Sequence, residues 1–117
     1  MTPELRAEPR LRVGIALFNA GAFFAAHEAW EELWLELVGE EKQLVQGLIQ
    51  IAAGYYKLEQ GNRSATRKLF EKALARIAAA GECGNDAGVQ ALVSVVGEQL
   101  RLLASAAPLT APQLTIG

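Results

Sequence analysis

Apolar residues recur at helical spacing along nearly the whole chain and predict five helices. The first three run from about Pro9 to Asn19, from Ala22 to Val38 and from Glu41 to Gln60, with Gly39 ending the second. A fourth begins after Gly61 and Asn62, because glycine can stop one helix and asparagine can cap the next. The fifth follows a glycine-rich loop and is capped by Asn85 or Asp86.

The third of these helices is apolar over an unusually wide arc, so it must be covered on more than one side. We therefore place it at the centre of the fold. Gly47 and Gly54 lie on one line of this helix. Each lowers helix propensity by about 1 kcal/mol relative to alanine, so the pair predicts that another helix passes close by.

The chain nearly repeats itself after forty residues, a period typical of helical-repeat folds. The matching positions are Gly21, Ala25, Trp30, Glu31 and Trp34 against Gly61, Ala65, Phe70, Glu71 and Leu74. We predict an all-α fold in which two antiparallel helix-turn-helix hairpins are followed by a C-terminal capping helix. Residues 1–107 form a single domain in this prediction, and residues 108–117 form an irregular tail.

Two resemblances support this prediction. The segment Tyr55-Tyr56-Lys57, Gly61-Asn62, Ala65 and Phe70-Glu71-Lys72-Ala73-Leu74 resembles the core of a tetratricopeptide repeat. That likeness implies stacked helix pairs of the kind that bind peptides or proteins.

A more extensive resemblance covers about residues 18 to 74. Its first segment comprises Phe18-Asn19, Gly21, Phe23-Phe24, Ala26-His27-Glu28 and Trp30-Glu31-Glu32-Leu33-Trp34. Its second comprises Gln46 to Gln50, Ala52-Ala53, Tyr55-Tyr56 and Gly61-Asn62. Together they resemble a small bacterial and archaeal family, domain of unknown function family 309. The resemblance implies an all-helical fold and supplies no activity.

Composition narrows the classes of function. The net charge of −2 gives no field that would attract nucleic acid or an anionic membrane. The one cysteine, Cys83, excludes an internal disulfide and suits a reducing compartment. The residues from Met1 to Arg12 lack the apolar core of a signal peptide, and the longest apolar run is too short to span a bilayer. We expect a cytoplasmic protein with no cofactor.

The candidate site lies on one flank of the second predicted helix. His27 and Glu31 are i, i+4 neighbours, and Phe24 and Val38 bracket them, so we expect this flank to be covered. Glutamines on the central helix form a polar row that could face the pair. The candidate ligand-binding residues are His27, Glu28, Glu31, Trp34, Gln46 and Gln50. They form either a buried polar network that fixes helix docking or a pocket for a ligand.

Function remains open between two classes. We favour a non-catalytic binding or scaffolding domain with a protein or small-molecule partner, and self-association through the central helix is a further alternative. The competing hypothesis is a metal-dependent hydrolase that uses His27, Glu28 and Glu31, the outline of a zinc-protease helix. Catalytic zinc needs three protein ligands, and this chain has one histidine. We assign no catalytic or metal-binding residue.

Overall fold

Six α-helices and one short 3-10 helix make up the protein, and the computed structural model describes all 117 residues. The elements are α1 (Pro3–Ala7), α2 (Pro9–Asn19), α3 (Phe23–Trp34), α4 (Gly39–Glu59), α5 (Arg63–Ala79), η1 (Gly81–Asn85) and α6 (Ala87–Leu102). There is no strand, so the predicted all-α class is confirmed. None of the helices combines the length and the apolar character that crossing a membrane would require.

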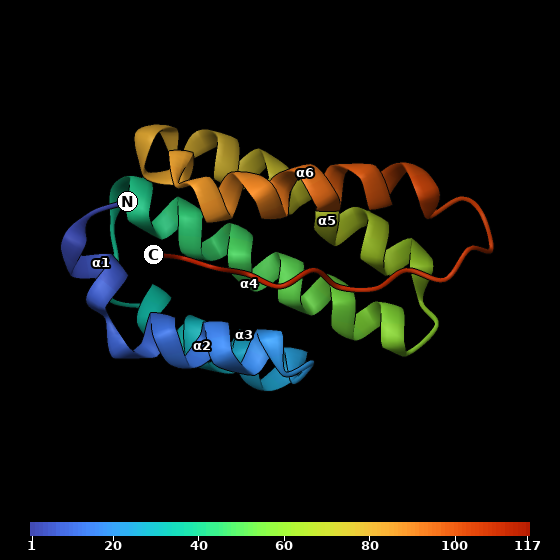
Figure 1. Cartoon of the computed structure of the whole chain (residues 1–117), viewed down its shortest axis with the longest axis horizontal. Coiled ribbons are helices and arrows are strands. Elements are labelled where there is room, and N and C mark those ends of the chain that lie inside the picture. Colours follow the sequence, from blue (N-terminus) through green and yellow to red (C-terminus); the bar gives the residue numbers. More distant parts are fainter.

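Helix α4 lies in the middle of the molecule, as its wide apolar arc predicted. Helices α2 and α3 lie on one side of it, and α5 and α6 lie on the other (Figure 1). In chain order, α2 packs on α3, α3 on α4, α4 on α5 and α5 on α6. The finer prediction, that the hairpins stack as in tetratricopeptide repeats, stays a prediction.

The forty-residue period reappears in the geometry of two turns. Gly21 follows α2 with φ of 80°, and Gly61 follows α4 with φ of 78°. In both turns the residue after the glycine donates its N–H to the carbonyl five residues earlier, at 2.9 Å. This pattern closes a helix C-terminus and favours glycine at the position with positive φ. The repeat in the sequence therefore records a repeated local structure.

Helix α5 approaches α4 closely at the two glycines of the central helix. A Cβ atom added to Gly47 would lie 2.5 Å from Ile77 and 3.1 Å from the carbonyl oxygen of Ala73. One added to Gly54 would lie 2.5 Å from the ring of Phe70. The prediction of a close helix neighbour at this line is confirmed.

Two predicted features of α3 are wrong. The helix ends at Trp34 rather than at Val38, and Gly39 begins α4 instead of ending α3. Leu35 and Val38 are 72% and 81% exposed, so the apolar residues that suggested a further helical turn have nothing to pack against. Gly39 takes a φ of 65°, and the direction of the chain changes there.

The sequence also missed both short helices. Helix α1 brings Arg6 to Asp86, where the guanidinium Nη1 lies 2.6 Å from Oδ2 of the carboxylate. Asp86 also caps α6 by accepting hydrogen bonds from the backbone N–H groups of Gly88 and Val89, at 2.9 and 3.1 Å. The predicted cap therefore has a second role in holding the first helix.

We predict that Gly14→Ala destabilises the protein by about 1–3 kcal/mol, the usual range for overpacking. Gly14 of α2 lies under the indole of Trp30, and an added Cβ would fall 2.0 Å from its Nε1. Urea unfolding measures the effect. Gly97→Ala is the matched control, because a Cβ at this position of α6 meets nothing within 4 Å. Equal free energies of unfolding for the two variants would contradict this packing.

We predict that Asp86 stabilises the fold above its unfolded pKa of about 4 and loses this effect as the pH falls. Burial alone would raise the pKa of Asp86, but hydrogen bonds from Val89, Arg6 and Gly88 outweigh it and lower the pKa. Asp86→Ala should therefore lower the free energy of unfolding at pH 7 by about 1–3 kcal/mol, as expected for a charged hydrogen-bonding group. Denaturant unfolding of both proteins at several pH values should show this gap narrowing in acid. A gap independent of pH would refute the assignment.

Candidate functional site

His27 and Glu31 form the predicted pair on α3. The His27 Nε2 atom lies 3.1 Å from Oε1 of Glu31, and the two side chains are 23% and 51% exposed. The second ring nitrogen of His27, Nδ1, is buried and has no hydrogen-bond partner. The expected cover over this flank is absent, because Phe24 and Val38 are 50% and 81% exposed. Phe24 is in the first turn of α3, whereas Val38 lies beyond its end, in the link to α4.

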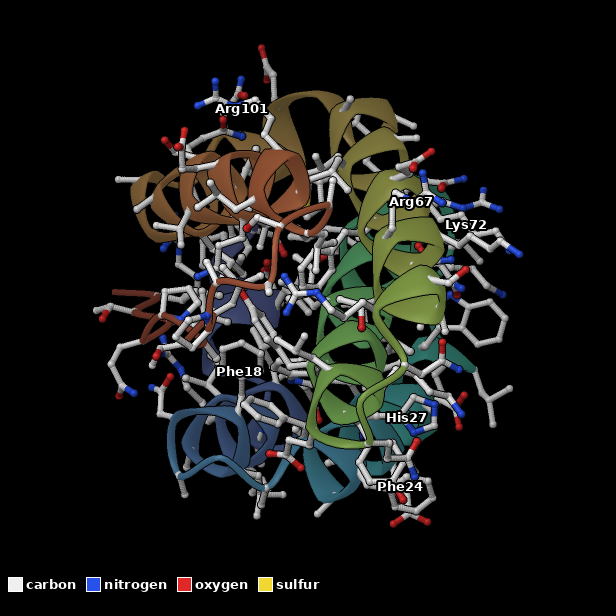
Figure 2. The ribbon with its side chains drawn as sticks, turned by 90° about the vertical axis from the view of Figure 1, so that its right-hand side faces the viewer. Phe18, Phe24, His27, Arg67, Lys72 and Arg101 are labelled. Atoms are coloured by element: carbon white, nitrogen blue, oxygen red, sulfur yellow. The ribbon has the colours of Figure 1, made fainter.

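An aromatic cluster lies at the N-terminal end of the same helix. The ring of Phe24 is 5.6 Å from the imidazole of His27 and 5.3 Å from the ring of Tyr56 on α4, centroid to centroid. Phe24 and His27 project to the same side of the molecule (Figure 2). Phe24 therefore offers half of an aromatic side chain to solvent beside the His27–Glu31 pair.

Trp34 lies at the other end of α3 and differs from Trp30 in its surroundings. The Trp30 side chain is fully buried and donates its indole N–H to the carbonyl of Leu11, at 3.1 Å. Trp34 is half-buried, and its indole N–H is hidden from solvent without an acceptor. The Lys42 ammonium lies 4.4 Å above the Trp34 ring, a cation–π contact.

A shallow hollow of about 200 Å³ opens beside this tryptophan. Its lining comes from three helices and consists of Trp34, Lys42, Gln43, Gln46 and Arg76. Arg76 of α5 donates through Nη1 to Oε1 of Gln43, at 3.3 Å. The lining contains two cations and no carboxylate, so the hollow favours a negatively charged group.

The structure joins some of the six predicted residues and leaves others apart. His27 meets Glu31, and Trp34 meets Gln46 at the hollow, but no hydrogen bond links the pair on α3 to Gln46 or Gln50. Gln50 is only 9% exposed, and its Oε1 has no partner. Glu28 is exposed and joins neither group. These side chains therefore do not form the hydrogen-bonded network considered from sequence, and both His27 Nδ1 and Gln50 Oε1 are buried without a partner.

Metal-ion chemistry would need more ligands than this flank brings together. Nowhere in the chain do three His, Cys, Asp or Glu side chains gather in a way that could hold a metal ion. Cys83 lies in η1 and is buried, and this burial raises the pKa of its thiol. The site can therefore offer hydrogen bonds, an aromatic surface and two cations.

Lys42 and Arg76 are the site residues that sequence reasoning missed. Lys42 precedes Gln46 by one helical turn, so the glutamine row extended backwards could have included it. Arg76 belongs to a row of basic residues on α5 that resembles an ordinary solvated face. Only the packing of α5 against α4 brings it to Gln43.

A larger hollow of about 450 Å³ lies elsewhere, beside the tail, and includes none of the predicted residues. Three polar side chains on that side are buried or half-buried and form hydrogen bonds: Asn19, Tyr55 and Gln99. Tyr55 donates its hydroxyl to Oε1 of Gln99 at 2.5 Å, and burial raises the pKa of this hydroxyl. The sequence assigned no role to Gln99.

We predict that Gln50→Leu leaves the free energy of unfolding unchanged or raises it, because the substitution removes a buried acceptor that has no partner. Gln99→Leu is the matched control. Gln99 is equally buried at 9% exposure, but its amide accepts from Tyr55 and donates to the Thr110 carbonyl at 2.7 Å. Its loss should destabilise by about 1–3 kcal/mol. Thermal unfolding compares the two, and an equal loss of stability in both would show that Gln50 is satisfied.

A family model described as "Domain of unknown function (DUF309)" matches residues 11–69, half of the chain. No curated protein matches it. The matched stretch runs from α2 into α5 and contains all six predicted site residues. It also agrees with the resemblance found in the sequence motifs. The chain belongs to the DUF309 family.

Proposed function

We propose that this domain is a non-catalytic binding module that holds an acidic polypeptide segment on the face formed by α3, α4 and α5. We call this surface the α3–α5 face, and its residues are Phe24, His27, Glu31, Trp34, Lys42, Gln46, Gln50 and Arg76. One observation carries the proposal: three buried polar atoms of this face lack partners. They are Nδ1 of His27, Nε1 of Trp34 and Oε1 of Gln50.

Unpartnered polar atoms are costly, which is why most buried polar groups in proteins are hydrogen-bonded. Each one left without a partner costs about 1–3 kcal/mol. All three atoms belong to the two neighbouring helices α3 and α4. A bound segment that supplies polar groups here would recover part of this free energy.

The positive charge at one end of this face favours a segment with an acidic side chain. Lys42 and Arg76 flank the hollow beside Trp34, and the lining contains no acidic side chain. On α5, Lys72 also projects toward the side that carries His27 (Figure 2). A carboxylate can accept from these cations directly, and it can accept from the indole N–H of Trp34 once the side chains that cover this atom move aside on binding. We therefore place an acidic side chain of the partner at this hollow.

The size of the face favours a polypeptide over a small molecule. Trp34 and Phe24 are ten residues apart on one helix, which corresponds to about 15 Å along its axis. An extended segment of about five residues covers this distance. Phe24 would receive an apolar side chain of the partner, and Glu31, between the two ends, would accept a hydrogen bond from its backbone.

We do not propose the metal-dependent hydrolase. His27 and Glu31 approach each other, but Glu28 lies exposed and no third ligand joins them. Catalytic zinc in proteins is held by three side chains.

Selection from a display library of random decapeptides tests the proposal, with the full chain as bait. We expect the selected peptides to be enriched in Asp and Glu together with one aromatic or aliphatic residue. Their affinity should fall at least about tenfold in Lys42→Gln/Arg76→Gln, since each lost charged hydrogen bond is worth about 1.5–3 kcal/mol. Isothermal calorimetry measures the change.

Arg101→Gln is the matched control. Arg101 is an exposed arginine of α6 that projects away from the face carrying His27 and Phe24 (Figure 2). This variant should bind the selected peptides as the wild type does. The proposal fails if the library yields no acidic peptides, or if the three proteins bind the selected peptides equally.

A further inference from the structure

The tail, residues 108–117, lies in a channel of its own. After α6 it turns back and runs between α2 and α6 across α4 (Figure 1). It lies on the opposite side of α4 from Phe24 and His27 (Figure 2). Two of its aliphatic side chains, Leu114 and Ile116, are 1% and 3% exposed and belong to the hydrophobic core. The tail is therefore an extended segment seated by alternate side chains.

Side chains of the helices bind the backbone of this segment. The Asn19 amide contacts both backbone groups of Leu114: its Oδ1 accepts from the N–H at 2.7 Å, and its Nδ2 donates to the carbonyl at 2.9 Å. Gln99 donates to the carbonyl of Thr110 at 2.7 Å, and Arg12 donates to the carbonyl of Ile116. Such contacts recognise an extended backbone rather than one side chain, as in other peptide-binding grooves.

A glycine on α6 leaves room for the tail. A Cβ atom added to Gly88 would fall 1.5 Å from the backbone oxygen of Thr115. Any larger residue at this position would displace the segment. We call the channel the tail groove and define it by Arg12, Asn19, Gly88 and Gln99.

The residues that connect α6 to the tail form few contacts with the rest of the protein. Arg63 of α5 donates through Nε to the carbonyl of Leu103, at 3.0 Å, and so holds the end of α6. Residues 104–108 then follow and are all exposed. Beyond them, residues 109–113 line the hollow of about 450 Å³ together with Phe18 and Tyr55, and Leu109 and Ala111 pack against the core. The tail can leave the groove by rearrangement of five exposed residues.

We propose that the tail groove is an interface between two copies of this chain, in which the tail of one copy occupies the groove of the other. The contacts that seat the tail involve only the groove and residues 109–117, so a second copy would reproduce every one of them. Exchange of an identical element is a common route to dimers. In a single copy the short connection keeps the tail at an effective concentration of about 1 mM, which favours the monomer in dilute solution.

Complementation between two full-length variants tests this proposal. Gly88→Ala blocks its own groove and releases an intact tail, whereas Leu114→Asp keeps an open groove and loses the tail anchor. Sedimentation velocity should show each variant alone as a monomer and the mixture as a one-to-one heterodimer. The dissociation constant of the heterodimer should lie below about 100 µM, because the wild-type tail stays seated at an effective concentration of about 1 mM. Gly97→Ala is the matched control for Gly88→Ala, because it lies on the same helix and a Cβ atom there meets nothing within 4 Å. Its tail stays seated in its own groove, so a mixture of Gly97→Ala and Leu114→Asp should form no heterodimer.

A mixture that stays monomeric while both variants give folded circular dichroism spectra would overturn the proposal. If either variant fails to fold, the wild type decides. Isotope-labelled and unlabelled chains are refolded together at about 1 mM, the effective concentration of the tether. Filtered nuclear Overhauser spectra should then show contacts between Leu114 of one chain and Asn19 of the other, the residues joined by two hydrogen bonds in the groove. Their absence in such a sample would also overturn it.

Discussion

Close packing against bare backbone is the constraint on which this fold depends. At Gly14 the backbone of α2 carries the indole of Trp30, and at Gly47 and Gly54 the backbone of α4 admits side chains of α5. Protein interiors are packed as densely as organic crystals, so even one added methyl group at these glycines would force the helices apart. The indole N–H of Trp30 also satisfies the carbonyl of Leu11, which ties α3 to α2. Because α4 packs directly on α3 as well as on α5, these three helices form one layer.

This layer has two faces with different chemistry. On one face the tail supplies the missing cover, and each polar group we name there, Asn19, Tyr55 and Gln99, has a partner. On the other face no segment of the chain covers α4, the amide oxygen of Gln50 has no partner, and the unpartnered indole nitrogen of Trp34 belongs to a hollow lined by two cations. One central helix therefore separates a surface completed by the chain itself from a surface that we propose a partner completes.

The sequence predicted the fold well because the signals that define it are local. The turn glycines, the Asn62 and Asp86 caps and the bounds of α2 follow from neighbouring residues alone. It failed at Val38, where an apolar residue continued the helical pattern but found nothing to pack against. Of the site, periodicity identified the His27–Glu31 pair, which lies on one helix. Arg76 at the hollow could not be predicted, because it reaches Gln43 from another helix.

The two indole N–H groups report most directly on whether a bound partner completes the α3–α5 face. The chain has two tryptophans, so its proton–nitrogen correlation spectrum should show two indole signals, one from Trp30 and one from Trp34. On addition of a selected acidic peptide, the Trp34 signal should move downfield as its N–H gains an acceptor, and the Trp30 signal should stay in place. A Trp34 signal that already shows a hydrogen bond in the free protein, or that does not move on binding, would contradict the account.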